Sequence, residues 1–179
     1  MLVRIAEDAL RNAEENAVGS LYQTLIAMTF AALAVEALCN AIGERRIEGW
    51  KDDFESCSPN AKLRLIADSL DVPYRNDEDP WLSARWLIKF RNAVAHAKPE
   101  AVKETKIMSQ KEHDLRLFDM PESKLEKSIT LGNARKAIRV LDDLKQLLLP
   151  KVPDHQSDGL TLDSWSGTSR IYEDQQRSG

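Results

Sequence analysis

An arginine and a histidine with four residues between them, Arg91 and His96, are the side chains in this sequence best suited to chemistry on a phosphodiester. Arginine presents a planar fork of N–H donors that matches phosphate oxygens. Histidine has the side chain whose ordinary proton affinity lies nearest neutral pH, so it can exchange a proton during a reaction. The charged residues from position 81 to position 99 are all basic: Arg85, Lys89, Arg91 and Lys98. This local charge of +4 lies in a chain of net charge -4, so any contact with nucleic acid is expected to be local.

The spacing of these residues predicts how they share a helix. Each residue of an α-helix advances by about 100°, so one polar stripe is expected to hold Arg85, Lys89, Asn92 and His96. The adjoining apolar stripe, expected to pack on the core, holds Trp86, Phe90, Ala93, Val94 and Ala97. Arg91 lies about 140° of rotation from His96. One straight helix therefore aims both side chains at one phosphate only if the arginine sweeps round, or if a second copy completes the site across a two-fold axis.

Apolar periodicity predicts the helices that position this motif, and no β-strand signal of any strength appears. The helix over residues 21–42 is apolar nearly all round and is expected to be central, with Ser20 as its cap and Gly43 as its end. Trp50 and Phe54 are expected to anchor the charged connection that follows. The other predicted helices cover residues 2–17, a segment starting at Ser58-Pro59 with a stripe of Leu63, Ile66, Ala67 and Leu70, a motif helix opening at Pro80-Trp81, and residues 133–149.

The chain is predicted to divide into one helical domain, residues 1–149, and a disordered tail, residues 150–179, which is rich in Asp, Ser, Gln and Gly. Residues 102–121 are polar and mixed and are expected to form a short helix and a long excursion. With 42% hydrophobic and 30% charged residues, the composition fits a soluble, helix-rich globular protein. The sequence therefore predicts an all-α fold.

Compartment and cofactor use are predicted from what the sequence lacks. Cys39 and Cys57 make no framework of bridges, and Cys39 reads as a small core residue in a reducing compartment. The apolar stretch at residues 25–38 is interrupted by Thr29 and Glu36 and is expected to be too short to span a bilayer. The start of the chain lacks the apolar run of a signal peptide. We therefore expect a cytoplasmic protein with no membrane contact.

Metal catalysis and other common chemistries find little support in the motifs. The histidines, His96, His113 and His155, are far apart, and no metal-binding cysteine or histidine pattern occurs. Seven glycines are dispersed, and none has the spacing of a phosphate-binding loop. We expect no metal and no cofactor. Trp81 and Trp86 are candidates for stacking on bases, although tryptophans at helical spacing beside Phe90 more often belong to the core.

The segment Phe90-Arg91-Asn92-Ala93-Val94-Ala95-His96 resembles the Arg-x4-6-His signature of HEPN domains, including a polar residue after the arginine. The order of helices over residues 1–149 is similar as well. The resemblance implies an up-and-down bundle of four to five helices, usually dimeric, that often acts as a metal-independent endoribonuclease. It implies that His96 is the general acid or base, that Arg91 contacts the phosphate and the transition state, and that Asn92 is an orienting polar group.

The implied substrate is RNA, because a ribose 2′-OH would attack its own phosphate, and Arg85, Lys89 and Lys98 are predicted to bind it. Glu36 and Asn40 lie one turn apart on an otherwise apolar helix. They are either polar residues bonded to neighbours at the helix edge, or supports that hold Arg91 or His96 from behind. Charge swaps at Glu36 that alter cleavage but spare folding would favour the second interpretation.

Three functions remain open at this stage. The first is an endoribonuclease that acts as a homodimer with a composite site, in the role of a toxin or defence effector with a cognate antitoxin or regulatory protein. The second is a non-catalytic dimerisation or adaptor module whose basic groove binds a nucleotide, RNA or a protein. The third is a plain structural bundle, in which replacement of Arg91 or His96 changes neither binding nor phenotype.

Overall fold

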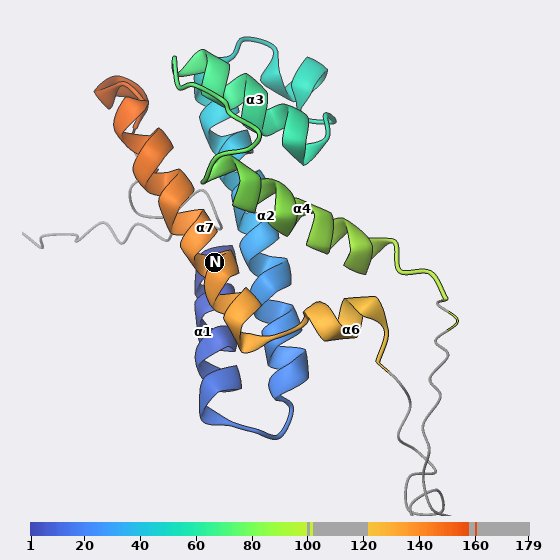
Figure 1. The fold of residues 1–179 in the computed structure, drawn as a ribbon. Coiled ribbons are helices and arrows are strands. Elements are labelled where there is room, and N and C mark those ends of the chain that lie inside the picture. The colour runs from blue at the N-terminus through green and yellow to red at the C-terminus, as the bar shows by residue number, and fades with distance from the viewer. Residues whose placement is uncertain (100, 102–121, 158–159, 161–179) are drawn as a thin grey trace, which may run out of the picture.

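In the described part of the chain the protein is all-α, and Figure 1 shows the arrangement. The computed structural model describes residues 1–99, 101, 122–157 and 160. The longer helices are α1 (Leu2–Glu15), α2 (Ser20–Arg46), α3 (Pro59–Ser69), α4 (Trp81–Ala95) and α7 (Leu131–Leu148). Shorter elements are the π-helical turn η1 (Trp50–Phe54), α6 (Lys124–Ser128), and the 3-10 turns η2 (Leu149–Lys151) and η3 (Asp154–Gln156). The excursion expected at residues 102–121 lies outside the described residues.

Helix α2 is the central element, as its apolar composition predicted. It packs against α1, α3, α4 and α7, and α4 crosses it obliquely in Figure 1. Its interior side chains include Ala27, Ala31 and Ala34, which let neighbouring backbones approach closely. By length and mean hydropathy α2 is also able to cross a membrane, which corrects the expectation that its apolar stretch is too short; half of the apolar window is buried in the bundle. The burial is what the core helix of a bundle requires.

The ends of α2 differ from those predicted. Gly19, with φ of +78°, forms the turn after α1, and Ser20 is the first helical residue, with its hydroxyl donating to the Ala13 carbonyl at 3.0 Å. Gly43 does not end the helix. It lies inside α2, which continues to Arg46. The residue is a glycine because the indole of Trp50 packs on it, and a Cβ there would lie 2.3 Å from the ring. Gly43 therefore marks a close contact with Trp50, and the prediction that it ends the helix was wrong.

Helices α3 and α4 begin close to their predicted positions. Ser58 caps α3, its hydroxyl accepting from the Ala61 N–H at 3.3 Å, with Pro59 as the first helical residue. The Asp79 carboxylate accepts from the Ser83 N–H at 3.1 Å in the first turn of α4. Helix α4 ends at Ala95, one residue before His96. The site residues are thus carried on one helix that crosses the core helix and then stops.

The folded region continues past the boundary predicted at residue 149. Val152 and Leu160 are buried in the core, and the Arg46 guanidinium donates to the Gln156 side chain at 3.2 Å. Their burial explains why η2 and η3 stay on the bundle, so the predicted tail cannot begin at residue 150. The rest of the predicted tail, residues 161–179, lies outside the described residues. Helix α7 begins at Leu131, two residues earlier than predicted, capped by Thr130.

Candidate functional site

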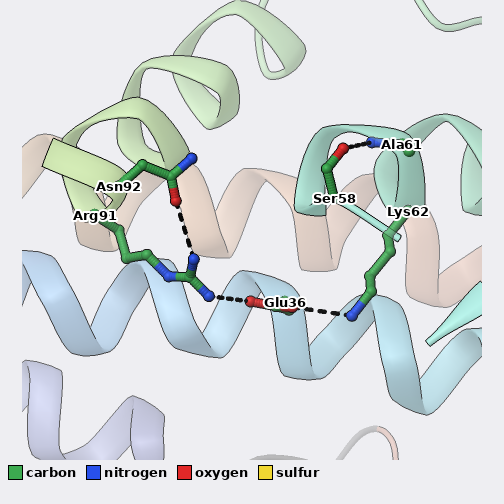
Figure 2. Close-up of polar contacts among 6 residues, drawn as sticks. All are labelled: Glu36, Ser58, Ala61, Lys62, Arg91 and Asn92. Carbon is green, nitrogen blue, oxygen red and sulfur yellow. Dashed lines mark hydrogen bonds and ion pairs between the residues drawn. The ribbon is translucent and has the colours of Figure 1, made fainter. Parts of the chain in front are cut away.

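Glu36 of α2 joins α3 and α4 through both of its carboxylate oxygens (Figure 2). Its Oε2 accepts from Nη2 of Arg91 at 2.6 Å, and its Oε1 accepts from Nζ of Lys62 at 2.9 Å. Side-chain exposure is 22% for Glu36, 27% for Arg91 and 2% for Lys62. One interpretation of the sequence predicted that Glu36 supports either Arg91 or His96. The structure shows that Glu36 contacts Arg91. These three residues are called the Glu36 network below.

Lys62 is the member of the Glu36 network that the sequence analysis did not identify. It lies one turn before Ile66 and beside Leu63, within the buried stripe of α3. A lysine in an apolar stripe predicts a carboxylate partner in the interior of the fold, because a buried charge must be paired. Glu36, the one acid inside the apolar part of α2, was the matching signal. Read together, the two residues predict the ion pair.

The two asparagines predicted to support the site behave differently. Asn92 Oδ1 accepts from Nη1 of Arg91 at 2.9 Å, which is the kind of contact that the predicted orienting role requires (Figure 2). Asn40 lies one turn beyond Glu36, and its Oδ1 is buried without a hydrogen bond to any described residue. No contact of Asn40 with Arg91 or with His96 is present there. Asn92 is therefore hydrogen-bonded to the Glu36 network without being part of it, and Asn40 makes no hydrogen bond to the network among the described residues.

His96 occupies a different environment from Arg91. It is the C-cap of α4, with φ of -120° and ψ of 33°, and its backbone N–H donates to the Asn92 carbonyl at 3.0 Å. Its side chain is exposed and makes no hydrogen bond or ion pair with the described residues. Because the helix has already ended, the ideal helical rotation does not fix the imidazole direction. Among the described residues the motif thus supplies a guanidinium bound to Glu36 and an imidazole without a hydrogen-bond partner.

His96 lines a groove of about 640 Å³ between the end of α4 and α6, which we call the α4–α6 groove. Trp86 and Phe90 of α4 and Leu125 of α6 line it, and the remaining lining is Ala93, Ala97, Ser123, Ser128 and the cations Lys89, Lys98 and Lys124. No Asp or Glu lines it in the part of the chain that the structure describes. Arg91 is not among the lining residues. The groove is apolar inside and cationic at its edge.

Ala93 and Ala97 correct the predicted apolar stripe of the motif helix. Both are exposed, while Trp86 and Val94 are half-buried and Phe90 is 6% exposed. The reason is that the end of α4 extends past the core helix α2, toward the short helix α6, as Figure 1 shows. The buried face of α4 instead uses Trp81, Ser83, Ala84, Leu87, Ile88 and Phe90.

The three side chains predicted to bind RNA do not all line this groove. Lys89 and Lys98 line the α4–α6 groove, whereas Arg85 does not. Arg85 donates to the Asn76 carbonyl at 3.3 Å, in the loop before α4. The two tryptophans also separate: Trp81 is buried, with its ring 4.8 Å from that of Tyr74, while Trp86 lines the groove. Trp81 is therefore a core residue.

The interior beside the Glu36 network is closed to solvent at Cys39. Cys39 is fully buried, and desolvation raises the pKa of its thiol from 9.0 to about 12, against the lowering effect of the Lys62 charge.

Among the described residues no three His, Cys, Asp or Glu side chains gather as metal ligands would. The groups available for chemistry at this end of α4 are thus the imidazole, the lysine ammonium groups and the guanidinium.

Comparison of the chain with known protein families, with curated proteins and with solved structures gives no match.

Proposed function

We propose that this chain is a metal-independent endoribonuclease of the HEPN type that acts as a two-fold dimer. The observation that carries the proposal is the environment of His96: an exposed imidazole without a partner among the described residues, in a groove with cations and no carboxylate in its described lining. A general base must bring a ring nitrogen within hydrogen-bond reach of the proton that it takes, and the exposed imidazole of His96 leaves its ring nitrogens accessible to a substrate. Cations around it attract a phosphodiester.

The reaction follows from these groups. His96 takes the proton of a ribose 2′-OH, and the 2′ oxygen attacks the adjacent phosphorus as the bond to the 5′ oxygen breaks. The proton that His96 has taken passes, directly or through water, to the leaving 5′ oxygen, and the products are a 2′,3′-cyclic phosphate and a 5′-OH end. Arginine donors stabilise the charge that builds on the phosphoryl oxygens. DNA, which lacks the 2′-OH, is not cleaved.

Arg91 is able to serve this reaction while it remains bound to Glu36. A guanidinium has five N–H donors, and the contacts with Glu36 and Asn92 use one donor on each terminal nitrogen. Three donors are left over, and the side chain is 27% exposed, so we expect part of the guanidinium to be within reach of a phosphate. Because Arg91 does not line the groove that holds His96, we propose that a second copy of the chain brings the two groups together across the two-fold axis.

The experiment is cleavage of RNA by purified protein in EDTA. We expect His96→Ala to lower the rate by a factor of about 10² to 10⁴, the usual contribution of a general acid or base. His155→Ala removes an exposed histidine elsewhere and is the matched control. A 2′-deoxy substitution at the scissile nucleotide abolishes cleavage. Cleavage that persists in both His96→Ala and Arg91→Ala, or that needs a divalent ion, would contradict the proposal.

The adaptor function keeps one observation in its favour. In a single chain the guanidinium of Arg91 is bound to Glu36 and does not line the α4–α6 groove. A module that only binds needs no convergence of Arg91 and His96. RNA binding without cleavage by the wild-type dimer would favour it over the endoribonuclease.

A further inference from the structure

The α4–α6 groove combines two kinds of surface that match the two halves of a nucleotide. Its interior is aromatic and apolar, from Trp86, Phe90 and Leu125, and its edge carries Lys89 and Lys98. Base faces stack on aromatic side chains, and phosphates bind ammonium groups. We propose that this groove binds an unpaired nucleobase against Trp86 and its adjoining phosphate at Lys89, and so is a specificity site of this chain; this rests on the proposed function above.

Trp86 is the side chain best placed to receive the base. It is half-buried and lines the groove, unlike Trp81, which belongs to the core. The Lys136 ammonium of α7 lies 4.6 Å from the centroid of the Trp86 ring. This cation–π contact holds the indole from the side of α7 and leaves less motion to be lost on binding. Trp86 thus forms a fixed aromatic wall.

Charge complementarity defines the class of ligand. Lys89, His96 and Lys98 are exposed along the edge, and the described lining includes no acid, so the groove favours an anion. Its volume of about 640 Å³ lies in the range of small-molecule sites, which is the scale of a nucleotide. A base inside a duplex is stacked and paired and cannot enter such a groove. The occupant we infer is therefore one splayed nucleotide of a single strand.

The experiment measures binding apart from cleavage. A fluorescent single-stranded hexanucleotide with 2′-O-methyl riboses cannot undergo 2′-OH attack, so its affinity for the full chain, read by anisotropy, reports the groove alone. We expect Trp86→Leu to weaken binding about tenfold, as loss of a stacked base does, and Trp86→Phe to retain most of it. Circular dichroism confirms that each variant is folded. A duplex of the same sequence is expected to bind at least about tenfold more weakly.

A matched pair of charge reversals locates the phosphate contact. Lys89→Glu and Arg85→Glu make the same change of charge one turn apart on α4, but only Lys89 lines the groove. Because Lys89 lines the groove and can bind the phosphate directly, whereas Arg85 acts on it only through space, Lys89→Glu is expected to weaken binding at least about tenfold at physiological salt and Arg85→Glu no more than about threefold. Equal effects of the two reversals would show that binding follows overall charge, and would overturn the proposal.

Failure of the groove and failure of the ribonuclease are distinguishable. Binding with the expected pattern, but no cleavage of unmodified RNA, refutes the ribonuclease and leaves the groove as a nucleotide site. Cleavage that Trp86→Leu and Lys89→Glu leave unchanged refutes the groove and leaves the ribonuclease. Equal binding of duplex and single strand, or displacement of the hexanucleotide by an acidic amphipathic peptide that itself binds more tightly, also overturns the assignment of the groove to an unpaired nucleotide.

Discussion

Helix α4 presents two cationic regions that differ in how their charges are held. In the Glu36 network, Arg91 is half-buried and shares one carboxylate with the fully buried Lys62. In the α4–α6 groove, Lys89, His96 and Lys98 are exposed and no acid lines the described walls. A buried charge without a partner is strongly unfavourable, whereas an exposed charge is solvated by water. The first region is therefore organised by the fold, and the second is left for a ligand.

The difference teaches that absence of acids from a helix does not make its cations free. No acid occurs from position 81 to position 99, yet Arg91 meets Glu36 of α2, which lies 55 residues earlier in the chain. His96 escapes this pairing because it follows the end of α4, beyond the part that crosses α2. Place in the fold, more than local composition, separates Arg91, which is bound to Glu36, from the exposed side chains of Lys89, His96 and Lys98, which make no ion pair with a described residue.

The largest expected effect is a difference in thiol reactivity, which tests whether the region behind the Glu36 network is closed. The raised pKa of Cys39, from 9.0 to about 12, lowers its thiolate fraction at pH 8 by a factor of about 10³. Cys57 is partly exposed. We expect a disulfide reagent at pH 8 to modify Cys57 quickly and Cys39 only on unfolding, with mass spectrometry of peptides identifying each site.

A matched variant strengthens this measurement. In Cys57→Ser, the native protein is expected to bind almost no reagent until denaturant is added. Rapid modification of Cys39 in that folded variant would show that water reaches the interior beside Glu36 and Lys62, and the contrast between the two regions would fail.

The next effect is on stability. Glu36→Gln leaves the buried ammonium of Lys62 without a carboxylate, and loss of one partner of a buried pair costs about 3 kcal/mol. We expect the free energy of unfolding in urea to fall by about that amount. Lys89→Gln removes a charge from the groove instead and is expected to change it by no more than about 0.5 kcal/mol.

A double variant separates pairing from packing. Lys62→Met combined with Glu36→Gln removes the buried charge as well as its partner, so it is expected to recover much of the lost stability. Equal losses in Glu36→Gln and Lys89→Gln would contradict the distinction between a region organised by the fold and a region left for a ligand.

The elements of the fold were largely predictable because apolar spacing and caps are local signals. The Ser58-Pro59 start of α3 and the apolar face of α2 both appear as expected. The interior position of Gly43 was not predictable, because the indole that packs on it belongs to a turn after the helix. Helix α6 was missed for a different reason: at five residues it is too short for a periodic stripe, although Ser123 and Glu126 carry the capping-box pattern.

The candidate site was predictable only in part. The contact between Glu36 and Arg91 was one of two expected arrangements, because an acid on an apolar helix needs a partner. The absence of Arg85 from the groove that Lys89 and Lys98 line was not predictable. It depends on where α4 leaves the core and where α6 contacts α4. Long-range packing decides which members of a sequence stripe share a surface.

The smallest expected effect concerns α6, the weaker wall of the groove. The Ser123 backbone N–H donates to the Glu126 carboxylate at 2.7 Å, and this bond lowers the pKa of Glu126 below its ordinary value of 4.5. A lowered folded-state pKa means that the bond stabilises α6 above the ordinary value and is lost as the pH falls through the folded-state value. We therefore expect the protection of the α6 amides, expressed relative to the intrinsic exchange rate at each pH, to decrease on acidification below pH 4.5, by a small factor because Glu126 is exposed. Glu126→Gln keeps an acceptor oxygen but does not titrate, so this pH dependence should disappear; if it persists in that variant, another group controls the wall of the groove.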